Sequence, residues 1–125
     1  MPDPAPAPVT LDRPDPPGGI AVCRLTGEID LDDHRAVAEA FARATALATT
    51  AVVVDCEGLA FCDSTLLNAL LGLRREAAAS GLRLVLAAPT GQLLRLLEIS
   101  GVAGLLPAHP TLGRALESLR DGGPA

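Results

Sequence analysis

Two hydrophobic spacings alternate along this chain. Short runs of aliphatic and β-branched residues predict strands that are buried on both faces. Longer segments, in which apolar residues recur every three or four positions, predict amphipathic helices. The predicted strands cover residues 9–11, 20–25, 51–54, 82–88 and 102–106, and the predicted helices run from about 32 to 48, 64 to 79, 90 to 98 and 112 to 119.

This alternation predicts an α/β fold in one small domain, residues 9–120. Helices of ten or more residues between strands favour parallel pairing, so we expect a mixed, mostly parallel sheet of four to five strands packed with about four helices. The first hairpin adds an antiparallel edge. Residues 1–8 are rich in Pro and Ala and are predicted to form a disordered tail, and residues 121–125 a flexible one.

The first predicted helix begins with two acids and carries one apolar stripe. Asp32 and Asp33 place negative charge where the helix dipole is positive. Thr49 and Thr50 end the helix before the central strand. The stripe expected to face the core consists of Val37, Ala40, Phe41, Ala44, Leu47 and Ala48.

The stretch at residues 51–71, AVVVDCEGLAFCDSTLLNALL, organises the rest of the chain. After the strand at 51–54, residues 55–58 have turn chemistry and 59–62 return briefly to an extended form. Asp63, Ser64 and Thr65 then open a helix. At this position Ser64 is predicted to be the N-cap, because its hydroxyl can accept a hydrogen bond from an amide two or three residues on.

Composition excludes several classes of function. The net charge is −5 and all ten basic residues are arginines, without a basic cluster or exposed aromatic surface, so direct nucleic-acid binding is not expected. We find no signal-peptide pattern and no apolar run of about 20 residues that could cross a bilayer. The cysteines, Cys23, Cys56 and Cys62, have no CxxC spacing, which favours reduced thiols in a cytoplasmic protein, with Cys23 packing as a small hydrophobe.

Acidic residues follow three of the predicted strands. They are Glu28 and Asp30, then Asp55 and Glu57, then Asp63 beside Ser64. Because the carboxyl ends of parallel strands share one edge, these three groups are expected to surround the start of the helix at Ser64. Such acids are typical of metal sites and of phosphotransfer in response-regulator receivers.

Each enzymatic interpretation lacks a necessary residue. Receivers need a lysine near the phosphoacceptor, and the chain has none. No GxxxxGK[ST] phosphate loop and no GxSxG elbow occur, and His34 and His109 lie in segments where histidines are usually solvated. Their spacing with the cysteines does not form a zinc site. We therefore expect no enzyme activity, no metal and no cofactor.

The residues around Ser64 resemble the central motif of the STAS domain, the fold of bacterial anti-sigma factor antagonists. In that family a hydrophobic strand ends in Asp, and after a short loop Asp-Ser-Ser/Thr-Gly-Leu opens a helix. Other segments are similar in order and spacing, and the resemblance covers residues 20–119. These segments are Leu25 to Asp30 (LTGEID), Leu82 to Leu86 (LRLVL) and Leu93 to Gly101 (LLRLLEISG).

The resemblance implies an anti-sigma factor antagonist. Such a protein binds an anti-sigma factor that is also a GHKL-type serine kinase, which releases the sigma factor, and phosphorylation of the serine in the Asp-Ser motif ends the binding. Here that serine is Ser64, with Thr65 as the fallback acceptor. The implied switch surface consists of Glu28, Asp30, Asp63, Ser64, Thr65 and Leu66.

Leu66 departs from the family pattern, which usually has glycine there. Its side chain is expected to project close to Ser64, where it would hinder a kinase or anchor a particular partner. Two other functions stay open. One is a STAS docking subunit of another complex, such as a lipid-transport ATPase, without phosphotransfer. The other, which the lack of Lys disfavours, is a small phosphate-handling enzyme.

Overall fold

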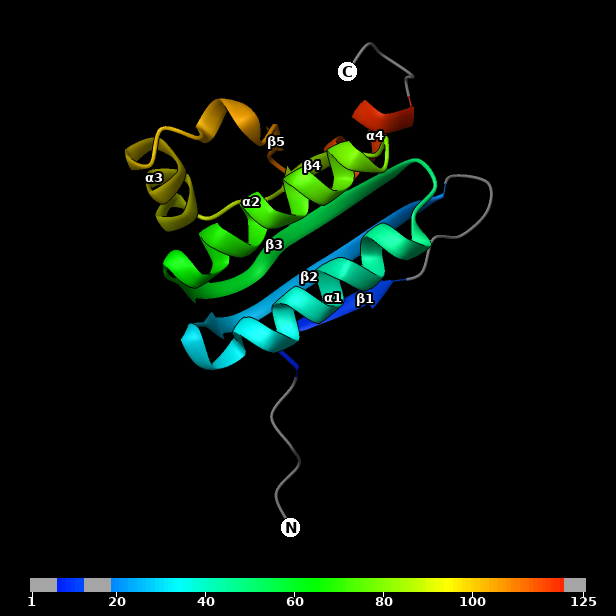
Figure 1. Cartoon of the computed structure of the whole chain (residues 1–125). Coiled ribbons are helices and arrows are strands. Elements are labelled where there is room, and N and C mark those ends of the chain that lie inside the picture. The colour runs from blue at the N-terminus through cyan, green and yellow to red at the C-terminus, as the bar shows by residue number, and fades with distance from the viewer. Residues whose placement is uncertain (1–6, 13–18, 121–125) are drawn as a thin grey trace.

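A computed structural model describes residues 7–12 and 19–120 of the chain. The helices α1 and α2 begin at the same end of the sheet and lie side by side across one of its faces (Figure 1). The elements, in chain order, are β1 (Val9–Asp12), β2 (Ile20–Ile29), the 3-10 helix η1 (Leu31–Asp33), α1 (His34–Leu47), β3 (Ala51–Cys62), α2 (Ser64–Ala79), β4 (Arg83–Ala87), α3 (Gly91–Ile99), the 3-10 helix η2 (Ala103–Leu105), β5 (Ala108–His109) and α4 (Leu112–Arg120).

The five strands form one sheet in the order β1-β2-β3-β4-β5. The β1 strand pairs antiparallel with β2, and every other pair is parallel. Two parallel strands need a crossover connection between them, and α1, α2 and α3 lie in the three crossovers. The predicted α/β class, with its antiparallel edge and mostly parallel sheet, is confirmed.

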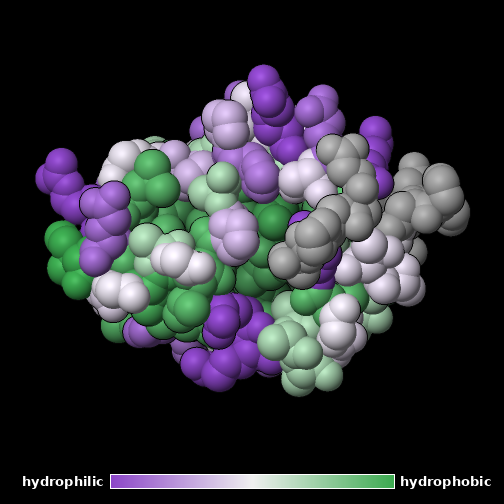
Figure 2. Space-filling view, turned by 90° about the horizontal axis from the view of Figure 1, so that it is seen from above, coloured by the Kyte–Doolittle hydropathy of each residue, from purple (hydrophilic) through white to green (hydrophobic). Residues whose placement is uncertain are grey.

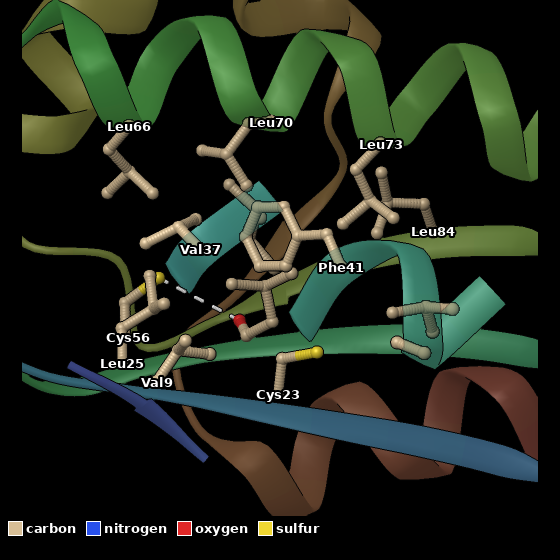
Figure 3. Close-up of a cluster of buried hydrophobic side chains, with 14 of the residues drawn as sticks. Val9, Cys23, Leu25, Val37, Phe41, Cys56, Leu66, Leu70, Leu73 and Leu84 are labelled. Atoms are coloured by element: carbon tan, nitrogen blue, oxygen red, sulfur yellow. Dashed lines mark hydrogen bonds between the residues drawn. The ribbon is translucent and has the colours of Figure 1, made fainter. Parts of the chain in front are cut away.

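The main core lies between the sheet and the two helices α1 and α2. Figure 3 shows Leu66, Leu70 and Leu73 of α2 directed towards this layer, with Phe41 of α1 among them. Cys23 and Cys56 are fully buried in the same cluster, as predicted for Cys23. A smaller core on the opposite face of the sheet joins α4 to the strands through Val22, Val53, Val85, Ala115 and Leu119.

The expected turn at residues 55–58 is wrong. β3 runs without a break from Ala51 to Cys62, but its register with β2 shifts twice, between Arg24 and Thr26 and between Gly27 and Glu28. At each shift β3 uses one residue more than β2, as in a β-bulge. The buried residues of this part are therefore three apart, Cys56, Leu59 and Cys62, and the missing alternation imitates a turn.

Gly58 fits the bulge because it has no side chain. A Cβ there would lie 3.0 Å from the carbonyl oxygen of Leu25 and 3.0 Å from Cγ2 of Thr26. The strand that precedes, β2, likewise continues past residue 25, its predicted end, through Gly27 and Glu28 to Ile29. These longer strands carry the chain from the core to the edge where α1 and α2 begin.

Two further expectations differ from the structure. Leu47, in the predicted core stripe, is 42% exposed, whereas Ala48 is buried, because α1 ends at Leu47 and the chain then turns towards β3. The predicted strand at 102–106 is instead η2, and the last strand is only Ala108–His109. Leu106 is buried there while Leu105 is 43% exposed, so one side chain anchors this turn.

The ends of the chain are only partly described. Ala7 and Pro8 precede β1, and both of their carbonyl oxygens accept hydrogen bonds from Thr26, at 3.0 Å and 2.9 Å. The rest of the predicted N-terminal tail and the predicted tail at 121–125 lie outside the described residues. Within the described part, no helix is long and apolar enough to cross a membrane.

Candidate functional site

The parallel pairing of β2 and β3 brings two acidic helix caps to one edge of the sheet. Ile29 and Cys62 are Cα partners at the ends of these strands. The next residue of each strand is an aspartate, Asp30 before η1 and α1, and Asp63 before α2. The two caps therefore lie at adjacent positions, at the edge where loops of parallel sheets usually carry function. We call this the cap edge.

Asp63, not Ser64, is the N-cap of α2. Its backbone is extended, with φ −128° and ψ −163°, and its Oδ1 accepts a hydrogen bond of 2.8 Å from the backbone N–H of Thr65. Its carbonyl oxygen also accepts from Leu66 N at 3.2 Å. The prediction that Ser64 caps the helix is wrong because the preceding carboxylate, a comparably good cap, already occupies that position.

Ser64 is therefore the first helical residue. Its side chain is exposed, and its hydroxyl makes no hydrogen bond to any residue in the described part of the chain. Thr65, the fallback acceptor, is half-buried. An exposed hydroxyl without a structural task is available for modification.

Leu66 is buried, although its side chain was expected to lie on the surface close to Ser64. Its side chain has no exposed area and points into the main core, where Figure 3 shows it opposite Val37. As the third residue of α2, Leu66 lies on the side of the helix that packs against the sheet. Leu66 therefore contributes to stability and cannot directly contact a partner protein.

Asp30 holds the other cap. Its Oδ1 accepts from Asp32 N at 3.0 Å, and its own backbone N–H donates to Oδ2 of Asp33 at 3.0 Å. These reciprocal bonds form a capping box. Neither Asp30 nor Asp63 forms an ion pair with any residue that the structure describes, so both charges are open to a partner.

Glu28 lies near the cap edge, but Asp55 does not. Glu28 is exposed in β2 and pairs in register with Phe61. Asp55 is only 4% exposed, seven residues before the end of β3, where its Oδ2 accepts a hydrogen bond of 3.1 Å from Arg24 and its Oδ1 accepts from Glu57 N. The expected gathering of three acidic groups is thus wrong for Asp55 and Glu57, because the strand continues past them.

The thiols below the cap edge are held in their neutral form. Burial, followed by the charges of Asp55 and Cys62, raises the pKa of the Cys56 thiol to about 12. Burial, followed by the charge of Asp63, also raises the pKa of Cys62, whose backbone N–H donates to Oε1 of Gln92 at 2.9 Å. Since the thiolate is the reactive species, neither cysteine is suited to nucleophilic chemistry near neutral pH.

The sequence did not reveal a groove that begins at the cap edge. This α1–α2 groove has a volume of about 350 Å³ and runs between the two helices. Its lining includes Thr65 and Leu31, and Leu31 is 72% exposed. The only indication of this groove in the sequence was Leu31, between Asp30 and Asp32. An apolar residue among acids at the start of a helix does not continue the apolar stripe that faces the core.

No three His, Cys, Asp or Glu side chains within residues 7–12 and 19–120 gather so that they could hold a metal ion. The carboxylates of Asp30 and Asp63 are each used in capping. What the cap edge offers chemically is one free hydroxyl, two unpaired carboxylates and an adjoining groove.

Solved structures similar to this chain include several anti-sigma factor antagonists. One from Mycobacterium paratuberculosis is 28% identical, with a TM-score of 0.73, and the match covers 94% of this chain and 98% of that one. SpoIIAA in its unphosphorylated form is 24% identical, with a TM-score of 0.74 and coverage of 90% and 96%. Bacillus SpoIIAA in its phosphorylated form is 24% identical, with a TM-score of 0.70 and coverage of 90% and 99%.

No curated protein matches the chain significantly. The sequence model of the family described as "Mlab, STAS domain", however, matches residues 15–107. That range spans well over half of the 125 residues and extends from before β2 to the residue before β5. The match agrees with the fold shared with the solved structures. This chain belongs to the STAS domain family.

Proposed function

We propose that this protein is an anti-sigma factor antagonist and that Ser64 is its phosphorylation site. In this proposal the unmodified protein binds an anti-sigma factor that is a GHKL-type serine kinase, so that a sigma factor is released. Phosphorylation of Ser64 ends the binding. The chain acts in the cytoplasm as a binding module and as the kinase's substrate, and it does not itself catalyse a reaction.

One observation carries the proposal. Ser64 is the first residue of α2, exposed, while Asp63 performs the capping that would otherwise occupy a serine there. A serine whose only role is structural would be expected to cap the helix. The similarity to an antagonist at 28% identity supports the partner class, and the similarity in fold to SpoIIAA, solved with and without phosphate, is consistent with the switch.

The proposed transfer is balanced by the kinase and ATP. The Ser64 Oγ forms a bond to the γ-phosphorus of ATP, the bond from that phosphorus to the β–γ bridging oxygen breaks, and ADP leaves. The hydroxyl proton passes to a base on the kinase. We do not assign that base to Asp63, because its Oδ1 is engaged by Thr65 N at 2.8 Å.

Charge explains why the modified protein would leave its partner. A phosphoryl group adds about −1.5 to −2 charge beside the unpaired carboxylates of Asp30 and Asp63. The helix dipole tolerates an anion at this position, but the amides of Thr65 and Leu66 are already bonded to Asp63. The added charge therefore faces outward. A partner shaped to accept the unmodified edge would have to bury an uncompensated dianion, which is costly.

The test is peptide mass spectrometry of the protein purified from its own host, beside the Ser64→Ala and Thr65→Val variants. We expect phosphate on the peptide that contains residues 63–65, retained in Thr65→Val and lost in Ser64→Ala. Incubation with each purified GHKL-type kinase of the host and ATP should produce the same pattern. If no growth condition and no kinase places phosphate on Ser64, the proposal is wrong, and a docking subunit without phosphotransfer becomes the better explanation.

A further inference from the structure

The α1–α2 groove is apolar at its base and open to the surface. The large side chains of Phe41 and Leu73, 3% and 2% exposed, form its floor. The rest of the lining combines the small residues Ala38, Ala69 and Gly72 with the polar residues His34, Asn68 and Glu76. The α2 residues that line the groove extend from Thr65 to Glu76. At about 1.5 Å per residue, the groove is therefore about 16 Å long.

Gly72 is the residue that keeps the groove open. It lies inside α2, where alanine would favour the helix more, and a Cβ built there meets only Nη2 of Arg75, at an ordinary 3.9 Å. Neither backbone conformation nor a tight contact therefore requires glycine at this position. Its effect on the surface is to leave space above Leu73 that a side chain would fill.

The groove opens beside the most acidic part of the molecule. Glu28, Asp30, Asp32, Asp33 and Asp63 all belong to the cap edge or its loops. These five charges equal the net charge of the whole chain, −5, so the other ten acids are balanced by ten arginines. Glu76 adds another carboxylate at the far end of the groove, close to Gly72, where a built Cβ would lie 3.9 Å from Nη2 of Arg75. The charge complement of this surface is basic.

Leu31 marks the entrance. It is 72% exposed, although it follows the capping residue Asp30, and it lines the groove together with Thr65. When a partner covers such an exposed leucine, the free energy of the complex is lowered by about 25 cal/mol for each Å² of apolar surface removed from water. A hydrophobic contact next to an acidic rim has the organisation of protein interfaces, with apolar anchors at the centre and charges around them.

We infer that the α1–α2 groove receives an amphipathic helix of the protein that docks at the cap edge. That helix presents apolar side chains one turn apart to Phe41, Leu73 and Leu31, and carries Arg or Lys towards the five acids. The groove's length matches about three helical turns, and helix-in-groove docking is a recurrent form of recognition. The inference rests on the proposed function, because it identifies the partner's binding element with the same Ser64 edge.

The experiment measures binding of the purified host GHKL-type kinase to the full-length chain by titration calorimetry, with ADP present so that phosphotransfer cannot occur. Gly72→Leu fills the groove, and Gly113→Leu places the same side chain on α4, where a Cβ meets only Oγ1 of Thr111 at 3.8 Å. Leu31→Ala removes the entrance leucine, and Ile99→Ala removes an isoleucine of α3 that is 77% exposed. Figure 2 shows hydrophobic surface on the left side of the molecule, where α3 lies in Figure 1. Circular dichroism and thermal melting establish that each variant folds.

We expect Gly72→Leu and Leu31→Ala to weaken kinase binding at least tenfold, and Gly113→Leu and Ile99→Ala to stay within twofold of the wild type. Wild-type affinity in both groove variants would overturn the inference, whereas phosphorylation of Ser64 in separate reactions of the same proteins with kinase and ATP would keep the proposed function. If no host kinase binds or phosphorylates the wild-type chain, both fail together. If native mass spectrometry finds a small molecule that Gly72→Leu loses without any change in kinase affinity, the groove is a ligand site and the inference is wrong.

Discussion

Asp63 links the stability of α2 to the presentation of Ser64. Its carboxylate bonds Thr65 N at 2.8 Å, and the serine hydroxyl is left free by that bond. We predict that Asp63→Ala lowers the free energy of unfolding by about 1 kcal/mol, the usual value of an N-cap. Asp63→Asn keeps a capping oxygen and should stay within about 0.5 kcal/mol of the wild type. Urea denaturation measures both, and equal losses in the two variants would contradict the capping role.

Cys56 makes stability depend on pH above neutrality. Its pKa is raised from 9.0 to about 12 in the folded protein, so the folded state favours the protonated thiol. The unfolded chain releases this proton first, and the contribution is complete below about pH 9 and is lost progressively towards pH 12. Each pH unit in that window should cost up to about 1.4 kcal/mol.

The comparison that isolates this effect is Cys56→Ala, unfolded in urea at pH 7.5, 9 and 10.5 with a reducing agent. We expect the wild type to lose more stability than the variant across this range, since the variant lacks the buried thiol. Parallel losses in the two proteins would show that other groups cause the alkaline destabilisation.

At the residue scale, the sequence identified the region of the site but not each residue's task. The order Asp-Ser-Thr before a leucine-rich segment placed the helix start correctly at Ser64. A pattern cannot decide which of two adjacent capping residues, Asp63 or Ser64, takes the cap, because both side chains can do so. Nor can it show that Leu66 faces the core, since that depends on how α2 lies across β3.

Among the elements, α2 is fixed to the sheet by its leucines. Leu66 and Leu70 have no exposed area, and Leu73 has 2%. We predict that Leu66→Gly, which restores the residue usual in the family, lowers the free energy of unfolding by about 3–6 kcal/mol. This combines about 2–5 kcal/mol for a buried leucine truncated to alanine with about 1 kcal/mol for glycine in a helix.

The matched control is Leu94→Ala on α3, where the leucine is 40% exposed. Its loss in urea denaturation should be well below that of Leu66→Gly, because its side chain already contacts water. Similar losses in the two variants would mean that Leu66 is not the core residue described here. The expected larger loss in Leu66→Gly would show that glycine cannot replace this leucine without loss of packing.

Element boundaries were predictable where one spacing held throughout, and failed where it changed. The β4 strand and α3, with Thr90 as its cap, lie within one residue of expectation. The long β3 was missed because two bulges replace alternation with a spacing of three at Cys56, Leu59 and Cys62. Bulges arise from pairing with β2, and a single segment carries no record of its partner's register.

At the scale of the whole molecule, charge is distributed unevenly. The acids of the cap edge account for the net charge of −5, while elsewhere acids and arginines balance. A partner kinase with basic residues would therefore be steered to this edge. We predict that its association rate falls by about tenfold or more as added salt suppresses that steering, while the dissociation rate changes less.

Stopped-flow mixing at several salt concentrations tests this prediction with two charge variants. Asp32→Asn removes an exposed acid of the cap edge, and Glu98→Gln removes an exposed acid of α3. Only Asp32→Asn should slow association at low salt, and its rate should approach that of the wild type at high salt. An equal effect of both variants would show that net charge, rather than its position, controls the encounter.

The fold as a whole was more predictable than the surface it presents. The α/β class, the antiparallel edge and the mostly parallel sheet follow from the alternation of the two spacings. The α1–α2 groove depends on the distance between two helices that are separate in the sequence. It also depends on Gly72, which leaves space only because it lies between these helices in the fold. Local sequence patterns therefore predict the helices and the sheet, but they do not predict a groove formed between two packed helices.

The aliphatic core gives this protein an unusual optical property. Its interior is built from Leu, Val and Ala around Phe41, and the chain contains neither Trp nor Tyr. It is therefore almost transparent at 280 nm and contributes no tryptophan emission. In a mixture with a partner that contains tryptophan, every change in that emission reports on the partner, so the complex can be followed without attaching a dye to either protein.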